Sequence, residues 1–179
     1  MSSIKIFVAF QKIIAGVCVL IPLVLWYTDT GSEFRPSISN YVYMPHSYVF
    51  GMMLTMGAML FIFNGALYWN TSDDMGVSDH GKWYNAVLGF ALLLVICFPH
   101  LQYPIPHYIF ACTFFVGNAL VTLVFHRKAD AFGSIAIGSL TMLSFVLVFT
   151  HTVSLLVAEW VSLTCIAGHF IMQSNTDKL

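Results

Sequence analysis

Charged side chains are scarce in this sequence. Only 8% of its 179 residues are Asp, Glu, Lys or Arg, whereas 59% are apolar, and soluble domains carry about 25% charged residues. No run of basic residues occurs, so the chain lacks the positive patch that binds nucleic acid. A soluble fold of this length could not bury so much apolar surface. The composition therefore predicts a membrane protein and excludes nucleic acid as a partner.

Short catalytic motifs are also missing. The sequence contains no glycine-rich phosphate loop, no GxSxG nucleophile motif, and no HExxH or HxxxH metal motif. Its cysteines lie in apolar runs without a CxxC pair, which is typical of small buried apolar residues. No catalytic residue can be assigned from a motif, and whether the chain is an enzyme stays open.

Long apolar runs dominate the sequence instead. A helix needs about 20 mostly apolar residues to cross a bilayer. The last run, residues 132–172, would span about 60 Å as one helix, so we expect it to turn back at the polar segment 150–154. The predicted helices cover about residues 5–27, 46–69, 83–98, 106–125, 132–150 and 153–172. The sequence predicts an all-α, polytopic transmembrane bundle of six helices, in a single domain over residues 1–179.

The positions of the basic residues predict the orientation of this bundle. With the N-terminus inside, only Arg35 falls on the outer side. The basic residues on the inner side are Lys5, Lys12, Lys82, Arg127, Lys128 and Lys178. Basic residues concentrate on the cytoplasmic side of membrane proteins. We therefore expect a multi-pass integral membrane protein with both termini in the cytoplasm.

One carboxylate lies inside a predicted helix. Glu159 falls about 12 Å into the sixth helix from its outer end, where a charge costs about 2.5–3.5 kcal/mol. We therefore expect Glu159 to face the bundle interior, where Arg35, His107 or its own protonation satisfies it. Ser162 and His169 follow Glu159 near one helical face, which predicts an inward polar stripe.

Histidines gather at the same outer end in this topology, and two interpretations of them stay open. Histidine and carboxylate side chains bind zinc, and bound zinc activates water. A metal-dependent lipid hydrolase or remodelling enzyme would use His46, His100, His107, His151 and Glu159, with zinc as its cofactor. In the structural interpretation these histidines lie among lipid headgroups, where amphipathic side chains are stable, and no cofactor is required. The missing metal motif favours the structural interpretation.

Small residues recur every four positions in two predicted helices. They are Ser47, Gly51 and Thr55 in the second helix, and Ser134 and Gly138 in the fifth. Small side chains at this spacing allow helices in lipid to approach closely. We expect both rows to lie at helix–helix contacts.

Three short groups of residues carry a family resemblance. They are Pro36-Ser37-Ile38-Ser39-Asn40 followed by Pro45-His46, His107 with Phe114-Phe115, and Glu159-Trp160. In these residues the chain resembles the DRAM/FRAG/SFK family of six-helix membrane proteins. The chain departs from the family at Asn40, where aspartate is usual. The resemblance implies six helices and a connection to lipid handling, without an established catalytic mechanism.

Three hypotheses for function follow. The favoured one is a non-enzymatic, lipid-interacting or regulatory membrane protein. Its outer site would comprise Arg35, Ser39, Asn40, His46, His107 and Glu159. The second hypothesis is the metal-dependent lipid enzyme, and the third is an accessory subunit of a larger membrane complex. The expected partners are membrane lipids, with a membrane protein or a second copy of the chain as a further candidate.

Overall fold

Six α-helices make up most of the chain that the computed structural model describes, residues 3–31, 34–71, 83–126 and 128–176. They are α1 (Ser3–Thr28), α2 (Ser47–Thr71), α3 (Tyr84–Cys97), α4 (Pro104–Val124), α5 (Ala131–Phe149) and α6 (Leu155–Thr176). Two 3-10 helices, η1 (Ile38–Tyr43) and η2 (Lys128–Asp130), lie in the connections. The predicted all-helical class is confirmed. Lys82, Arg127 and Lys178, on which the orientation partly rests, lie outside the described residues.

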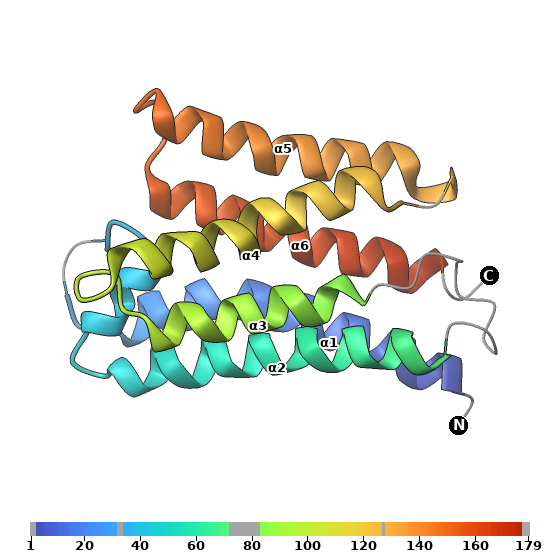
Figure 1. Ribbon diagram of the computed structural model, residues 1–179, viewed down its shortest axis with the longest axis horizontal. Coiled ribbons are helices and arrows are strands. Elements are labelled where there is room, and N and C mark those ends of the chain that lie inside the picture. The colour runs from blue at the N-terminus through green and yellow to red at the C-terminus, as the bar shows by residue number, and fades with distance from the viewer. Residues whose placement is uncertain (1–2, 32–33, 72–82, 127, 177–179) are drawn as a thin grey trace.

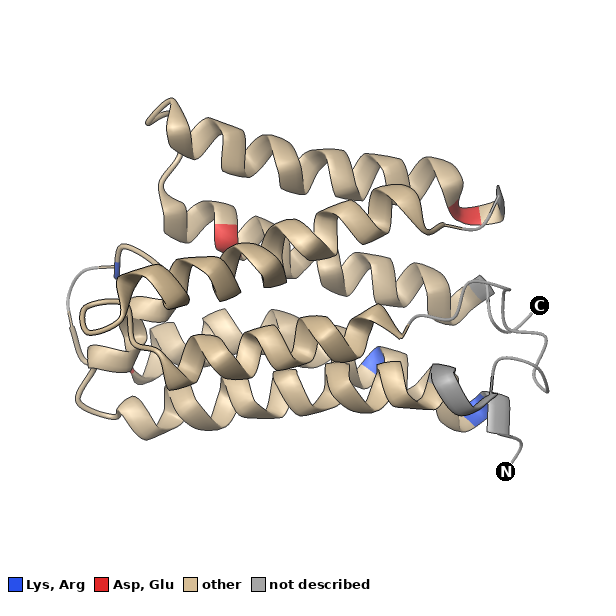
Figure 2. Ribbon diagram, in the orientation of Figure 1, with Lys and Arg blue, Asp and Glu red and all other residues tan. Residues whose placement is uncertain are grey.

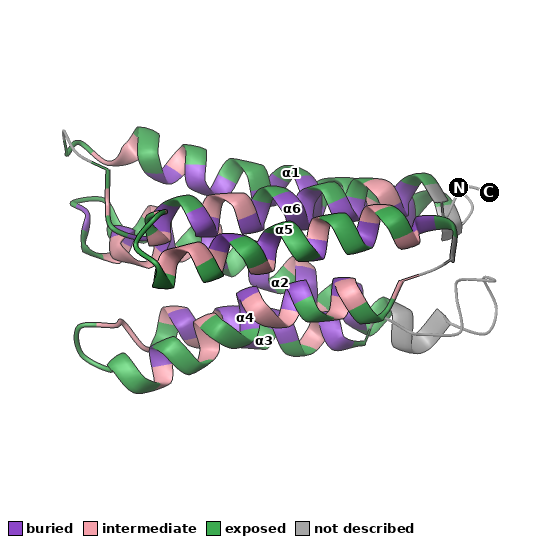
Figure 3. Ribbon diagram, turned by 90° about the horizontal axis from the view of Figure 1, so that it is seen from above, coloured by how far each residue is buried: buried purple, intermediate pink, exposed green. Residues whose placement is uncertain are grey.

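The helices form a closed ring in chain order. Each helix contacts the next, and α6 returns to contact α1. Figures 1 and 3 together show α1, α6 and α5 in one layer and α2, α3 and α4 in the other. Because consecutive helices run in opposite directions, α1 begins and α6 ends at the same end of the ring, here called the terminal end (Figure 1). The opposite end carries η1, the α3–α4 connection and the α5–α6 turn, and is called the η1 end.

Five of the described helices are long and apolar enough to cross a membrane, namely α1, α2, α4, α5 and α6. The apolar helix α3 has 14 residues, which span about 21 Å against about 30 Å of hydrocarbon. Large apolar side chains are also exposed, for example Phe132 and Phe149 at 88% and 85%. Figure 3 shows that exposed positions occur along the helices. Long stretches of the helices carry no charge (Figure 2). These features are consistent with a multi-pass membrane protein.

The chain turns sharply between α5 and α6, over residues 150–154. The Thr152 N–H donates a hydrogen bond of 3.0 Å to the Leu147 carbonyl. A hydrogen bond between residues five positions apart is found at the C-terminal end of many helices. His151 adopts a positive φ of 56° there, a conformation in which histidine is enriched among residues other than glycine. His151 is exposed and has a structural role in this turn.

The helices α2 and α3 approach each other closely at two glycines. A Cβ atom on Gly65 would lie 2.4 Å from the backbone nitrogen of Ala86, and one on Gly89 would lie 2.6 Å from the Ala58 carbonyl oxygen. These distances leave no space for a side chain. Glycine therefore permits backbone contact along the α2–α3 pair.

The two predicted rows of small residues have different outcomes. The row in α5 is confirmed, because Ser134 is buried and a Cβ atom on Gly138 would lie 3.0 Å from the Ala119 carbonyl oxygen of α4. For the row in α2 the prediction is wrong, because these residues do not lie at a contact with another helix of the chain. Ser47 and Thr55 are exposed, and nothing lies within 4 Å of a Cβ atom on Gly51. The close face of α2 instead contains Gly65.

Aromatic rings fill the middle of the ring of helices. Phe61 of α2 packs edge-on against Phe114 of α4 and Phe170 of α6, with ring centroids 5.5 and 5.4 Å apart. All three side chains are buried. This apolar layer separates polar groups near the η1 end from polar groups near the terminal end.

Candidate functional site

Glu159 lies near the beginning of α6 and is buried, with 5% of its surface exposed. Its Oε2 atom accepts a hydrogen bond of 2.5 Å from the Ile38 backbone N–H, which η1 contributes. Neither Arg35 nor His107 contacts it, so the predicted side-chain partners are wrong. The sequence contains no signal for which loop covers α6, so it does not indicate a backbone amide as the partner of Glu159.

A second hydrogen bond holds the same loop on α6. The Leu156 N–H donates to the Pro36 carbonyl at 3.1 Å. This N–H belongs to the first turn of α6, where backbone donors have no partner within the helix. The two bonds, Leu156 to Pro36 and Ile38 to Glu159, together form what we call the α6 clamp. The clamp fixes the first loop, which comprises the described residues 29–31 and 34–46, over the end of the bundle.

Serine and asparagine side chains continue the network within this loop. Asn40 Nδ2 donates to Ser37 Oγ at 2.8 Å, and Ser37 Oγ lies 2.9 Å from Ser39 Oγ. Ser37 is buried, whereas Ser39 and Asn40 are partly exposed. The predicted site residues Ser39 and Asn40 therefore do lie near Glu159, on the loop that Glu159 binds.

A small cavity of about 30 Å³ adjoins Glu159. Its wall is apolar except for Glu159 and Ser39. The lining residues are Ile21, Ile38, Ser39, Leu54, Leu92, Val95, Ala111, Phe114, Phe115, Glu159 and Leu163. A volume of this size accommodates about one water molecule.

Arg35 pairs with Asp29 at the beginning of the first loop. Arg35 Nε donates to Asp29 Oδ2 at 2.6 Å and Nη2 donates to Oδ1 at 3.2 Å. The Arg35 hydrogen bond lowers the pKa of Asp29 below its usual value of 3.8. Phe34 stacks on Trp26 of α1 with ring centroids 5.9 Å apart. These contacts attach the loop to α1 as well as to α6.

His107 and His100 connect the α3–α4 turn to the first loop. His107 Nδ1 donates to the Phe98 carbonyl at 2.8 Å, because a carbonyl oxygen can only accept. The His100 ring lies 5.4 Å from that of His107 and 5.2 Å from that of Tyr43, whose hydroxyl accepts from the Leu101 N–H. Burial and the neighbouring His107 lower the pKa of His100. The pair stabilises the turn.

The predicted zinc ligands do not converge. Only His100 and His107 are neighbours. His46 is exposed beside Tyr48, and Glu159 binds the first loop. Within the described parts of the chain, no three His, Cys, Asp or Glu residues are arranged to hold a metal ion. The geometry that the zinc-enzyme hypothesis requires is not met there.

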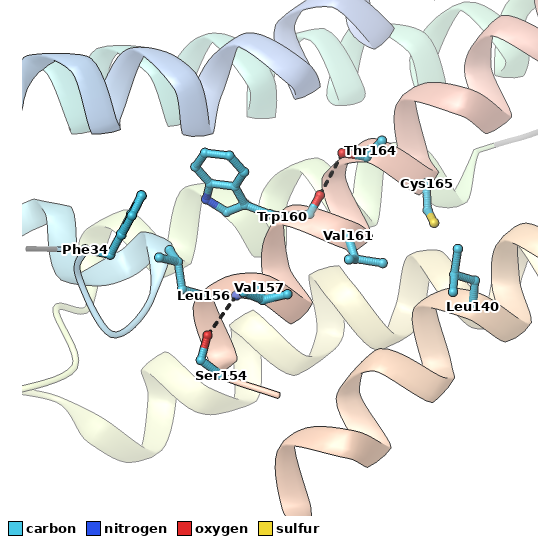
Figure 4. A pocket seen from close by; sticks show the side chains of 9 residues that line it. All are labelled: Phe34, Leu140, Ser154, Leu156, Val157, Trp160, Val161, Thr164 and Cys165. Carbon is cyan, nitrogen blue, oxygen red and sulfur yellow. Dashed lines mark hydrogen bonds between the residues drawn. The ribbon is translucent and has the colours of Figure 1, made fainter. Parts of the chain in front are cut away.

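An apolar groove of about 610 Å³ runs between α5 and α6 (Figure 4). Phe34 of the first loop and Leu140 of α5 lie at opposite ends of its lining, and Trp160 forms part of the wall. The other lining residues are Ser154, Leu156, Val157, Val161, Thr164 and Cys165. Ser154 accepts from the Val157 N–H and Thr164 donates to the Trp160 carbonyl. Both hydroxyls thus bond to backbone groups of α6, and the groove presents an apolar surface.

A separate polar cluster lies toward the terminal end. Asn85 Nδ2 donates to Asn64 Oδ1 at 2.6 Å, and Asn118 Nδ2 donates to the Phe114 carbonyl at 2.7 Å. On α6, Gln173 Nε2 hydrogen-bonds with His169 Nε2. A cavity of about 10 Å³ lies among residues of α3, α4 and α6, including Asn85, Asn118 and Gln173. The Asn85–Asn64 bond joins α3 to α2, and buried amides can bond helices together in this way in an apolar environment. The bonds of Asn118 and Gln173 lie within α4 and α6.

Comparison with known proteins gives one match. The profile of a family of unknown function (DUF7103) matches residues 20–174. The chain belongs to the DUF7103 family. The matched range contains the α6 clamp, the groove and the amide cluster, so all three lie in the part that defines this membership. No curated protein and no solved structure matches the chain.

Sequence reasoning missed the amide cluster, the Asp29–Arg35 pair and the groove. Asn64, Asn85 and Asn118 each interrupt an apolar run, which was an available signal for inward-facing polar positions. The predicted polar stripe of α6 is confirmed, because Glu159, Ser162 and His169 are all buried. The groove carries no local signal, because its lining comes from three separate segments.

Proposed function

We propose that this chain is a multi-pass membrane protein that binds the acyl chain of a membrane lipid, without catalysing a reaction on it. The observation that carries this proposal is the apolar groove of about 610 Å³ between α5 and α6. Small-molecule sites typically enclose about 300–1,000 Å³ and are mostly apolar. The groove lies on two helices that are each long and apolar enough to cross a membrane, so an acyl chain is the apolar ligand available to it.

The same proposal includes six crossings, with both termini in the cytoplasm. The beginning of α1 and the end of α6 share one end of the bundle (Figure 1), which an even number of crossings requires. Lys5 and Lys12 lie on α1, toward that end, in accord with the excess of basic residues on cytoplasmic sides. The η1 end then faces away from the cytoplasm. Because α3 is shorter than the hydrocarbon layer is thick, we propose that described residues beside its ends cross the membrane with it.

The resemblance of the first loop to the DRAM/FRAG/SFK family supports a connection to lipid. The structure adds a physical link between that loop and the groove. Phe34 lines the groove, and the α6 clamp holds the loop that carries Phe34. Glu159, Ser39 and Asn40 thus have a positioning role in this proposal, while the zinc-enzyme hypothesis has no converging ligand set among the described residues.

Photocrosslinking tests the groove. Purified protein in nanodiscs that contain a lipid with a diazirine on its acyl chain should crosslink at residues of the groove. Val157→Trp places a large ring in the groove and should reduce that crosslinking several-fold. Val146→Trp is the matched control, because Val146 is similarly exposed on α5 but does not line the groove. Equal crosslinking in both variants and the wild type would refute the lipid site.

Cysteine labelling tests the orientation. In a background without native cysteines, Leu101→Cys places a thiol at the η1 end and Ala129→Cys places one at the terminal end, both at exposed positions. A membrane-impermeant maleimide should label the first in intact cells and the second only after permeabilisation. Labelling of both positions in intact cells would refute the six-crossing topology.

A further inference from the structure

The cavity beside Glu159 has a feature that the clamp does not use. The Oε2 atom of Glu159 binds the Ile38 N–H, while no described residue donates to Oε1. The adjoining cavity of about 30 Å³ is lined by Glu159 and Ser39, and a space of this size holds about one water molecule. A water there would be a donor to Oε1.

A chain of hydroxyl groups leads from this cavity toward the η1 end. Asn40 Nδ2 donates to Ser37 Oγ, and Ser37 Oγ lies within hydrogen-bond distance of Ser39 Oγ. Either hydroxyl can donate in the Ser37–Ser39 pair. When Ser37 donates to Ser39, the Ser39 hydroxyl is left to donate into the cavity that it lines. Because Ser39 is partly exposed whereas Glu159 is buried, Ser39 lies at the boundary between the solution and the buried carboxyl group.

The charged pair of the first loop and the histidines of the α3–α4 turn make other contacts, while His46 and His151 are exposed. The helices α1, α2, α3 and α4 contribute only uncharged side chains to the cavity wall. Asp29 and Arg35 pair with each other on the first loop. His107 binds the Phe98 carbonyl, and His100 packs against His107. Among the described residues, Glu159 is therefore the single ionisable side chain that lines the cavity.

We propose that Glu159 is a proton-binding site that exchanges with the solution at the η1 end through Ser39 and one water molecule in the cavity. Protonation moves one proton from the water to Oε1, as the water takes one from the Ser39 hydroxyl and Ser39 takes one from solution. The reverse sequence releases the proton. Ionisable side chains inside membrane-spanning segments often belong to proton relays in pumps and transporters.

Infrared spectroscopy of the protein in nanodiscs tests the proposal. A carbonyl-stretching band of a protonated carboxyl group that is lost in Glu159→Gln identifies this residue. Its amplitude should change with pH, and the band should shift when D₂O replaces water. Ser39→Ala should slow the shift by about tenfold or more, because exchange then requires local opening, and about 1.4 kcal/mol corresponds to tenfold. Ser39→Thr keeps the hydroxyl and should exchange like the wild type.

Two further variants separate the exchange route from folding. Ser47→Ala makes the same substitution at an exposed position of the η1 end and should leave the exchange rate unchanged. Ala111→Val fills the cavity while Ser39 is retained, and should slow exchange as Ser39→Ala does. Wild-type exchange rates in both Ser39→Ala and Ala111→Val, or a Glu159 signal that is the same at every pH, would overturn the proposal.

Discussion

At the η1 end the buried polar contacts are made by a loop, whereas at the terminal end they are made by helices. Glu159 binds the Ile38 amide of η1, but Asn85 of α3 binds Asn64 of α2 directly. The first arrangement can open when the loop lifts, and the helices stay packed. The second opens only when α2 and α3 separate, because backbone contact at Gly65 holds these helices together. The two ends should therefore differ in local stability.

We expect the largest loss of stability from Gly65→Val at the terminal end. The new Cβ atom would lie 2.4 Å from the Ala86 nitrogen, and backbone atoms cannot move aside without separating α2 from α3. Overpacking of this kind costs about 1–3 kcal/mol, and we expect the upper part of that range. A thiol-reactive dye that reports exposure of buried Cys18 and Cys165 should show a lower unfolding temperature.

Gly51→Val is the matched control on the same helix, because nothing lies within 4 Å of a Cβ atom there. It should unfold near the wild-type temperature. If the two variants were equally unstable, close α2–α3 contact would not explain the stability of the terminal end.

Glu159→Ala at the η1 end should lower the unfolding temperature less than Gly65→Val does, and it should also change hydrogen exchange locally in the first loop. It removes the acceptor of the Ile38 N–H, and a buried donor without a partner costs about 1–3 kcal/mol. The loop can recover part of this cost by lifting into water. Hydrogen exchange should therefore accelerate at Ile38 and Leu156, with a smaller fall in unfolding temperature than in Gly65→Val.

Glu159→Gln retains an oxygen that can accept from Ile38 and should preserve most of this protection. A fall in unfolding temperature as large as that of Gly65→Val, without faster exchange at Ile38, would show that both ends unfold as one unit.

The smallest effect is expected for Asp29→Asn. Arg35 lowers the pKa of Asp29 in the folded protein, so the pair contributes stability above the usual aspartate pKa of 3.8, and this contribution is lost as pH falls further. The pair is partly buried at the surface of the protein, and surface ion pairs contribute about 0.2–1 kcal/mol. Wild type should be slightly more stable than Asp29→Asn at neutral pH and should lose that advantage in acid. An advantage that persists in acid would exclude the carboxylate as its source.

The sequence by itself determined the helices and most of their boundaries. Apolar runs and the polar segment 150–154 are local features, and local features decide where a helix in an apolar environment begins and ends. The inward face of α6 also followed from the sequence, since the spacing of Glu159, Ser162 and His169 is a property of one helix.

Only the tertiary structure decided which groups meet. The partner of Glu159 is a backbone amide 121 positions away, and backbone amides look alike in any sequence. The close α2–α3 contact uses Gly65 where the spacing of small residues had indicated Gly51, because spacing shows that a helix face is small without showing which neighbour covers it. The groove likewise exists only after the first loop, α5 and α6 are assembled. Contacts between distant segments depend on the packing of the whole ring, which hydropathy and helical period do not encode.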